Sequence, residues 1–123
     1  MGNGGNPSLS VGIDIIEIDR IRRAVDRWGW RFLERVYTLE EIELFATRPA
    51  SLAARFAAKE AVMKALGGKM GWREIEVLRG PRGEPVLRLY GRALRRAQEK
   101  GARLTVSLSH SREYAIASVV GQG

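Results

Sequence analysis

The chain has no cysteine and only one histidine among its 123 residues. The lack of cysteine excludes disulfide bonds, thiolate metal ligands and cysteine nucleophiles, and it suits a reducing compartment. Any bound metal ion must therefore be held by oxygen ligands or by the imidazole of His110.

The sequence also lacks a long apolar run. No segment approaches the roughly 20 apolar residues that a membrane-spanning helix requires. Residues 1–8 have neither the basic nor the apolar region of a signal peptide. We therefore expect a cytoplasmic protein without a membrane span. Residues 1–7 are predicted to be a flexible N-terminal segment and residues 8–123 a single domain, because this length fits one compact core.

Negative charge is scarce relative to positive charge: 21 Lys and Arg stand against 14 Asp and Glu, a formal net charge of +7. Such an excess favours an acidic or polyanionic partner. Arginines are concentrated on the segment after Asp19, at positions 20, 22, 23, 27, 31 and 35. A separate apolar face carries Ile18, Ile21, Val25, Trp28 and Phe32. This pattern predicts an amphipathic basic helix, and it is equally typical of an ordinary solvated helix face.

The first half of the chain predicts one strand and several helices. We expect a strand over 8–17, a helix over 19–28 and a connecting segment that extends to Tyr37. Thr38 and Glu41 have the spacing of a capping box, which predicts a short helix to about residue 47. A longer helix is expected after Pro49, ending where Gly67 and Gly68 follow.

The second half alternates strands with one further helix. Residues 75–78 and 86–90 predict a hairpin joined through 80–85, and residues 91–100 predict a helix. Residues 103–109 and 114–120 predict a last pair of strands. The expected fold class is therefore α+β, with helices packed on a largely antiparallel sheet.

The segment RFAAKEAVMKA at 55–65 places Glu60 and Lys64 four residues apart on one helical face. An isolated pair at this spacing is usually an exposed ion pair of small energy. Two other segments change this interpretation. The apolar segment at 11–21, which begins as a strand, carries Asp14, and the segment SLSHS at 107–111 holds His110. Together the three segments predict a site for phosphate and a metal ion.

These segments resemble the holo-acyl-carrier-protein synthases, the short 4'-phosphopantetheinyl transferases. The resemblance rests on GIDIIEIDRI at 12–21, on RFAAKEA followed by KALG at 64–67, and on VSLSH at 106–110 followed by Tyr114 and Ala115. It extends from about residue 11 to residue 120. It implies that the chain transfers the 4'-phosphopantetheine arm of coenzyme A to a serine of an apo acyl carrier protein, releasing adenosine 3',5'-bisphosphate, in fatty acid biosynthesis.

The resemblance also implies roles for individual residues. Asp14 and Glu60 match the carboxylates that bind Mg²⁺, an ion that prefers oxygen ligands and keeps several waters. Glu60, Lys64 and His110 match catalytic positions. The coenzyme A contacts implied by the resemblance come from Lys64, Gly67, Arg82, Gly83, His110, Ser111 and Arg48. The acceptor of the serine proton stays open between a metal-bound water near Glu60 and Glu60 itself.

Acyl carrier proteins are acidic, and in this family the first helix recognises them, so the resemblance assigns carrier binding to Arg20, Arg23 and Arg27. It also implies a homotrimer with active sites at subunit interfaces, in which Arg82 or His110 is supplied by a neighbouring chain. Two alternatives remain. A basic nucleic-acid-binding module would leave Asp14 unexplained, and a catalytically silent carrier-binding domain would keep the helix without turnover.

Overall fold

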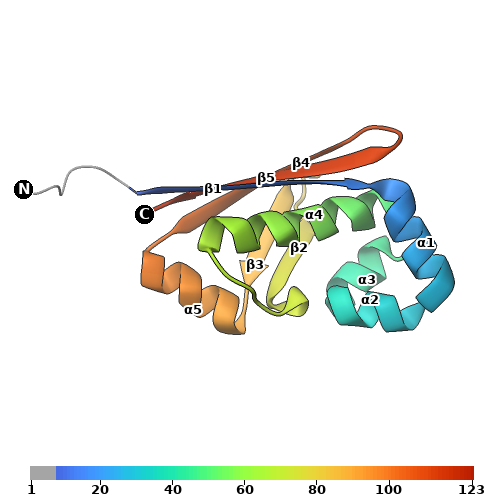
Figure 1. The fold of residues 1–123 in the computed structure, drawn as a ribbon, viewed down its shortest axis with the longest axis horizontal. Helices are drawn as coiled ribbons and strands as arrows, with labels where there is room; N and C mark the ends of the chain where they lie inside the picture. Colours follow the sequence, from blue (N-terminus) through green and yellow to red (C-terminus); the bar gives the residue numbers. More distant parts are fainter. Residues whose placement is uncertain (1–7) are drawn as a thin grey trace, which may run out of the picture.

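The computed structural model describes residues 8–123 (Figure 1), and the segment 1–7, predicted to be flexible, lies outside the described residues. In chain order the elements are β1 (Leu9–Glu17), α1 (Ile18–Trp28), α2 (Trp30–Val36), α3 (Leu39–Phe45), α4 (Pro49–Leu66), η1 (Trp72–Glu74), β2 (Ile75–Arg79), β3 (Pro85–Leu89), α5 (Gly91–Lys100), β4 (Arg103–His110) and β5 (Tyr114–Gln122). Among the described residues, no helix combines the length and the apolar character needed to cross a bilayer.

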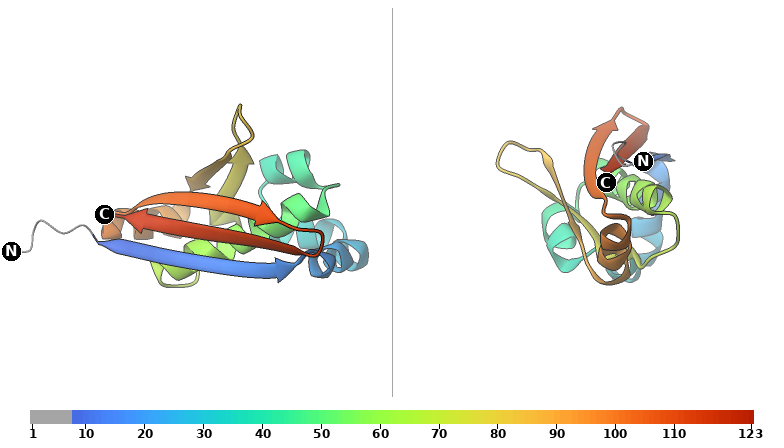
Figure 2. Two further views of the ribbon diagram at one scale, coloured as in Figure 1. Left: turned by 90° about the horizontal axis from the view of Figure 1, so that it is seen from above. Right: turned by 90° about the vertical axis from the view of Figure 1, so that its left-hand side faces the viewer.

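The strands form two antiparallel sheets. The larger sheet has the order β1-β5-β4, and β2 and β3 form a separate hairpin. Seen from above in Figure 2, the three long strands lie side by side while the hairpin projects away from them. Helix α4 runs along one face of the larger sheet (Figure 1) and packs against β1 and β5. The predicted α+β fold with antiparallel pairing is thus confirmed.

Close packing of β1 on α4 depends on a glycine. A Cβ atom built on Gly12 would lie 1.9 Å from the carbonyl oxygen of Ala61 in α4, so no other residue fits there. Side chains alternate along the strand, so Gly12, Asp14 and Ile16 share the face turned toward the helix. The strand therefore brings Asp14 close to the C-terminal half of α4.

The ends of α3 and α4 follow the predicted signals. The Thr38 hydroxyl accepts a hydrogen bond from the backbone N–H of Glu41, and the Glu41 carboxylate accepts one from the backbone N–H of Thr38, which completes the predicted capping box. Helix α4 starts at Pro49 and ends at Leu66, and it is capped by Gly67, whose φ of 76° is left-handed and favours glycine.

The prediction of a non-helical connection over 29–37 was wrong, because residues 30–36 form helix α2. Gly29, with φ 53°, ends α1 and turns the chain directly into a second helix that buries Leu33 and Val36. The same turn leaves Trp28 half exposed, so this residue does not belong to the buried face on which Ile18 and Ile21 lie.

The face of the larger sheet that points away from α4 is apolar along β1. Leu9, Val11, Ile13 and Ile15 alternate with the buried positions, and each is 56–66% exposed. The pairing register places Val120 opposite Val11 and Ile116 opposite Ile15, so the apolar surface continues onto β5. An exposed apolar patch of this kind is typical of a surface that contacts another protein.

Candidate active site

An ion pair joins the strand that carries Asp14 to helix α4. The Nζ atom of Lys64 lies 3.1 Å from Oδ1 of Asp14 and donates a second hydrogen bond, 2.9 Å long, to the carbonyl oxygen of Ile13. The Asp14 side chain is only 19% exposed, whereas that of Lys64 is half exposed. The sequence places Lys64 beside Glu60, and the structure adds Asp14 as the partner of its ammonium group.

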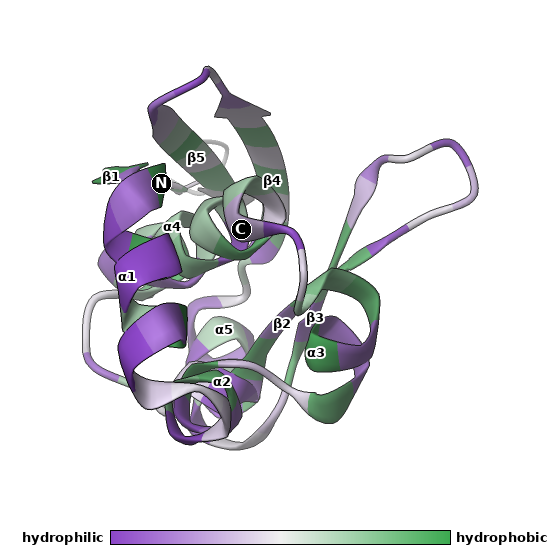
Figure 3. Ribbon diagram, turned by 90° about the vertical axis from the view of Figure 1, so that its right-hand side faces the viewer, coloured by the Kyte–Doolittle hydropathy of each residue, from purple (hydrophilic) through white to green (hydrophobic). Residues whose placement is uncertain are grey.

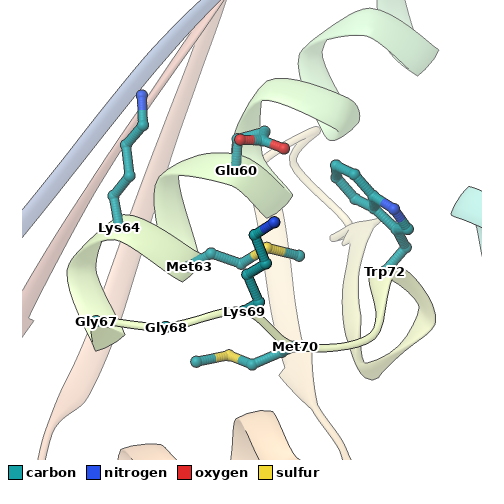
Figure 4. A pocket seen from close by; sticks show the side chains of 8 residues that line it. All are labelled: Glu60, Met63, Lys64, Gly67, Gly68, Lys69, Met70 and Trp72. Atoms are coloured by element: carbon teal, nitrogen blue, oxygen red, sulfur yellow. The ribbon is translucent and has the colours of Figure 1, made fainter.

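Beside this ion pair lies an open pocket of about 430 Å³ (Figure 4). Glu60 and Lys64 project from α4, and the segment that follows the helix forms the opposite wall. The lining residues are Glu60, Met63, Lys64, Gly67, Gly68, Lys69, Met70 and Trp72. The pocket thus combines two ammonium groups and a carboxylate with thioether and indole surfaces, which suits a phosphate attached to a less polar chain.

Lys69, Met70 and Trp72 were not among the predicted site residues. The indole of Trp72 stacks on Phe56 with ring centroids 4.8 Å apart and an interplanar angle of 26°. The available signal was the glycine-rich run that separates Leu66 from Trp72, because a glycine-rich segment after a helix often lines a site. The stacking itself depends on tertiary packing and leaves no local pattern.

The carboxylates present fit Mg²⁺ bound together with a substrate. Asp14 is joined to Lys64, and Glu60 lies one helical turn before Lys64 on the same pocket wall. Within residues 8–123, no group of three or more His, Cys, Asp or Glu side chains is arranged to hold a metal ion. Mg²⁺ does not need such a cage, because it commonly takes one or two carboxylates, substrate phosphates and several waters.

Five of the predicted coenzyme A residues do not line this pocket. Arg48 is an exposed residue at the start of α4, and Arg82 and Gly83 occupy the exposed tip of the β2–β3 hairpin. His110 ends β4, where its Nδ1 atom lies 3.3 Å from the carbonyl oxygen of Ser111. The Ser111 hydroxyl accepts hydrogen bonds from the backbone of Glu113 and Tyr114, so it caps the β4–β5 turn. Within one chain the structure therefore gathers Asp14, Glu60, Lys64 and Gly67.

The arginines predicted to bind a carrier lie on α1, which follows directly after β1. Arg20, Arg23 and Arg27 are all exposed, and the ribbon of α1 is largely in the purple of hydrophilic residues (Figure 3). Arg23 lies 3.2 Å from the carboxylate of Asp19, and the Arg27 guanidinium sits 5.0 Å from the ring centroid of Trp28. Exposed ion pairs of this kind are weak, so the arginines remain available to an acidic partner.

The chain is similar in sequence to proteins of one known family. A model of the 4'-phosphopantetheinyl transferase superfamily matches residues 10–119. The chain is 55% identical, over 93% of its length and 98% of the relative, to the holo-[acyl-carrier-protein] synthase of Dehalococcoides mccartyi strain 195. It is 53% identical, over 94% and 99%, to the enzyme of the same name from Herpetosiphon aurantiacus.

Solved structures agree with this assignment. The Helicobacter pylori holo-[acyl-carrier-protein] synthase in complex with coenzyme A matches with a TM-score of 0.81 at 34% identity, covering 90% of this chain and 98% of that one. The coenzyme A complex of the synthase from Chronobacterium ammoniagenes gives a TM-score of 0.81 at 32% identity, with 94% and 97% coverage. The chain belongs to the holo-[acyl-carrier-protein] synthase family of the 4'-phosphopantetheinyl transferase superfamily.

Proposed function

We propose that this chain transfers the 4'-phosphopantetheine group of coenzyme A to a serine hydroxyl of an apo acyl carrier protein. The observation that carries the proposal is the joining of Asp14 and Lys64 across β1 and α4, beside the pocket that contains Glu60. The two relatives named holo-[acyl-carrier-protein] synthase, which match over nearly their whole length, support the same activity.

In this reaction the serine oxygen forms a bond to the phosphorus that carries the pantetheine arm. The bond from that phosphorus to the bridging oxygen breaks, and adenosine 3',5'-bisphosphate leaves with the electron pair. Such phosphoryl transfers depend mainly on positioning and on stabilisation of negative charge. Lys64 lines the pocket and its side chain is half exposed, so its ammonium group can bind a pyrophosphate oxygen as a point charge.

Asp14 and Glu60 are the residues that would hold Mg²⁺. Bound there, the ion would neutralise negative charge on the pyrophosphate. Asp14 also holds the ammonium group of Lys64 beside β1, so this ammonium group is oriented before coenzyme A binds. Glu60 is the protein carboxylate in the pocket wall and is the candidate that would accept the serine proton, directly or through a water.

We propose that α1 binds the carrier through Arg20, Arg23 and Arg27. The helix begins one residue after β1, the strand on which Asp14 lies. A carrier bound on this helix would therefore place its serine near the metal-binding carboxylates. A basic helix and an acidic carrier attract each other over the Debye length, which is about 8 to 10 Å at moderate salt.

We also propose a homotrimer that uses the apolar face of the larger sheet. Leu9, Val11, Ile13 and Ile15 form an exposed apolar row on β1 that a monomer would leave in water. Arg82 and His110 do not line the pocket of their own chain, and in the proposed trimer they would contact coenzyme A bound by a neighbour. Active sites at subunit interfaces would explain this separation.

The test is to incubate the chain with coenzyme A, MgCl₂ and an apo carrier and to weigh the carrier by mass spectrometry. We expect the carrier to gain one phosphopantetheine arm. Binding of the carrier without a gain in mass would favour the silent carrier-binding domain. Tight, salt-sensitive binding of DNA or RNA with no modification of the carrier would favour the nucleic-acid-binding module.

A further inference from the structure

Helix α4 contains a completely buried lysine one residue before Glu60. The Lys59 side chain has 0% exposure, and its ammonium group donates to three oxygens. Its acceptors are Oε1 of Glu41 at 2.8 Å, the carbonyl oxygen of Trp72 at 3.1 Å and the carbonyl oxygen of Ile75. The proposed chemistry uses neither this lysine nor Glu41, although a buried charge costs considerable free energy.

Glu41 is also completely buried, and it connects three parts of the fold. One oxygen accepts from Lys59 and from the backbone nitrogen of Thr38, and the other accepts from the backbone nitrogen of Val77 at 2.8 Å. The pair therefore links α3, α4, the η1 turn and β2 at one point. An apolar pair of similar volume could fill the same space at little or no cost in stability.

An apolar pair would not, however, hold the Trp72 carbonyl. Trp72 ends the segment 67–72 that forms the pocket wall opposite α4. The start of this segment is fixed separately, because Gly67 donates to the carbonyl oxygen of Met63 at 2.8 Å and accepts from Arg96 at 3.1 Å. Lys59 supplies the polar anchor at the other end, where the Trp72 ring stacks on Phe56.

The hydrogen bond from Lys59 to the Trp72 carbonyl oxygen holds a part of the pocket wall that lies beside Glu60. Phe56 and Glu60 lie four residues apart on the same face of α4, and Trp72 and Glu60 both line the pocket. A shift of the Trp72 backbone away from Lys59 would move the indole off Phe56 and widen the pocket next to the catalytic carboxylate (Figure 4).

We propose that Lys59, held by Glu41, is a positioning residue of the coenzyme A site, which fixes the Trp72 end of the pocket wall against α4. The proposal rests on the transfer activity proposed above. Lys59 does not contact the substrate. It sets the distance between the wall and the side chains of Glu60 and Lys64.

The test isolates the fluorescence of Trp72. The chain has three tryptophans, so the background Trp28→Phe/Trp30→Phe leaves Trp72 as the only one. In this background we compare Lys59→Met with the double variant Lys59→Met/Glu41→Gln, which leaves no buried unpaired charge. Lys100→Met, at the exposed end of α5, is the matched control for the substitution.

All chains are measured well below their melting temperatures. We expect acrylamide to quench Trp72 about twofold more strongly in both Lys59 variants, and the KM for coenzyme A to rise about tenfold, since small misplacements are costly in a preorganised site. The apparent KM for the carrier should stay unchanged, because α1 is not involved. Calorimetric titration of coenzyme A should show the same loss of affinity without relying on turnover.

A purely structural role would lower the melting temperature and leave Trp72 quenching and the KM for coenzyme A at the parental values, which would overturn the proposal. Failure of both variants to fold would also overturn it, because the pair would then be required for the fold itself. If the parent chain transfers no phosphopantetheine, the proposed function fails, whereas the quenching comparison still decides whether Lys59 anchors the wall.

Discussion

Lys64 contacts a residue that lies 50 positions earlier in the chain, because its ammonium group binds Asp14 on β1 while its side chain projects from α4 into the same pocket as Glu60. Two carboxylates and one ammonium at a pocket edge can neutralise and orient a pyrophosphate with its metal ion. Each of the two carboxylates should then matter far more for turnover than for stability.

Asp14→Asn and Glu60→Gln are expected to lower kcat/KM by about 100-fold or more, because each removes a charge aimed at the reacting phosphates. Glu17→Gln is the matched control, since Glu17 is exposed at the end of the same strand on the opposite face from Asp14. Melting temperatures report on the fold. Near-normal, magnesium-dependent activity of both variants would refute the assignment of the metal site.

Tyr37 gives the fold a measurable dependence on alkaline pH. Burial, with a further contribution from Glu41, raises the pKa of Tyr37 well above its ordinary value of 10.0. In the unfolded chain this phenol loses its proton near pH 10, whereas in the folded chain it keeps it. The contribution of Tyr37 to the free energy of unfolding is therefore fully present below pH 10. Above pH 10 it should fall by up to about 1.4 kcal/mol per pH unit.

Tyr37→Phe should remove this part of the alkaline decline. At pH 7 it should also cost about 1 to 3 kcal/mol, because the hydroxyl donates a 2.7 Å hydrogen bond to the buried carbonyl oxygen of Leu52. Urea unfolding between pH 8 and pH 11 provides the comparison, and the two chains share every other ionisable group. Equal slopes above pH 10 in both chains would contradict the account.

At the scale of elements, α1 is expected to act through its charge. Arg20→Glu and Arg23→Glu, tested singly, should each raise the apparent KM for the carrier by roughly 3- to 10-fold and leave that for coenzyme A nearly unchanged. Carrier binding should also weaken as salt rises. Arg95→Glu is the control, because it makes the same change of charge at an exposed position on α5.

The arginine prediction fails if these variants bind carrier normally. If they also lose a tight, salt-sensitive affinity for DNA or RNA, the basic helix serves nucleic acid and not a carrier. The measurement is a steady-state titration of carrier at two salt concentrations, which separates the charge effect from any change in the coenzyme A site.

Elements with strong local signals were predicted well from the sequence. The apolar run around Asp14 indicated β1, the capping box at Thr38 fixed the start of α3, and Pro49 and Gly67 fixed the two ends of α4. Helix α2 was missed because the segment between Trp28 and Tyr37 was expected to be only a connection. Gly29 is instead a sharp turn between two helices.

The residues of the candidate site were predicted in part. Asp14, Glu60 and Lys64 were recognised through their motifs, and the structure brings them to one place. The stacking of Trp72 on Phe56 was not predictable, because it depends on how the segment after α4 folds back. The buried pair of Lys59 and Glu41 was missed for another reason: charged residues are normally exposed, and only tertiary structure shows which of them are paired in the core.

At the scale of the whole molecule, the uncovered sheet face predicts assembly. Val11→Glu would place a carboxylate within the proposed trimer interface, at a position 66% exposed in the single chain. Since burying an unpaired charge is costly, we expect light scattering to show three chains for the parent and one for the variant. Leu94→Glu, on exposed α5, should remain trimeric. A monomeric parent chain with full activity would contradict the trimer and the shared active site.

The most direct test of the central claim is a quantitative transfer experiment. The chain is mixed with coenzyme A, MgCl₂ and excess apo carrier, and the modified carrier and the released nucleotide are measured together by mass spectrometry and chromatography. The account predicts one adenosine 3',5'-bisphosphate for each phosphopantetheine arm gained, and no gain when the acceptor serine of the carrier is replaced by alanine. An unmodified wild-type carrier, with the chain folded and coenzyme A bound, would contradict it.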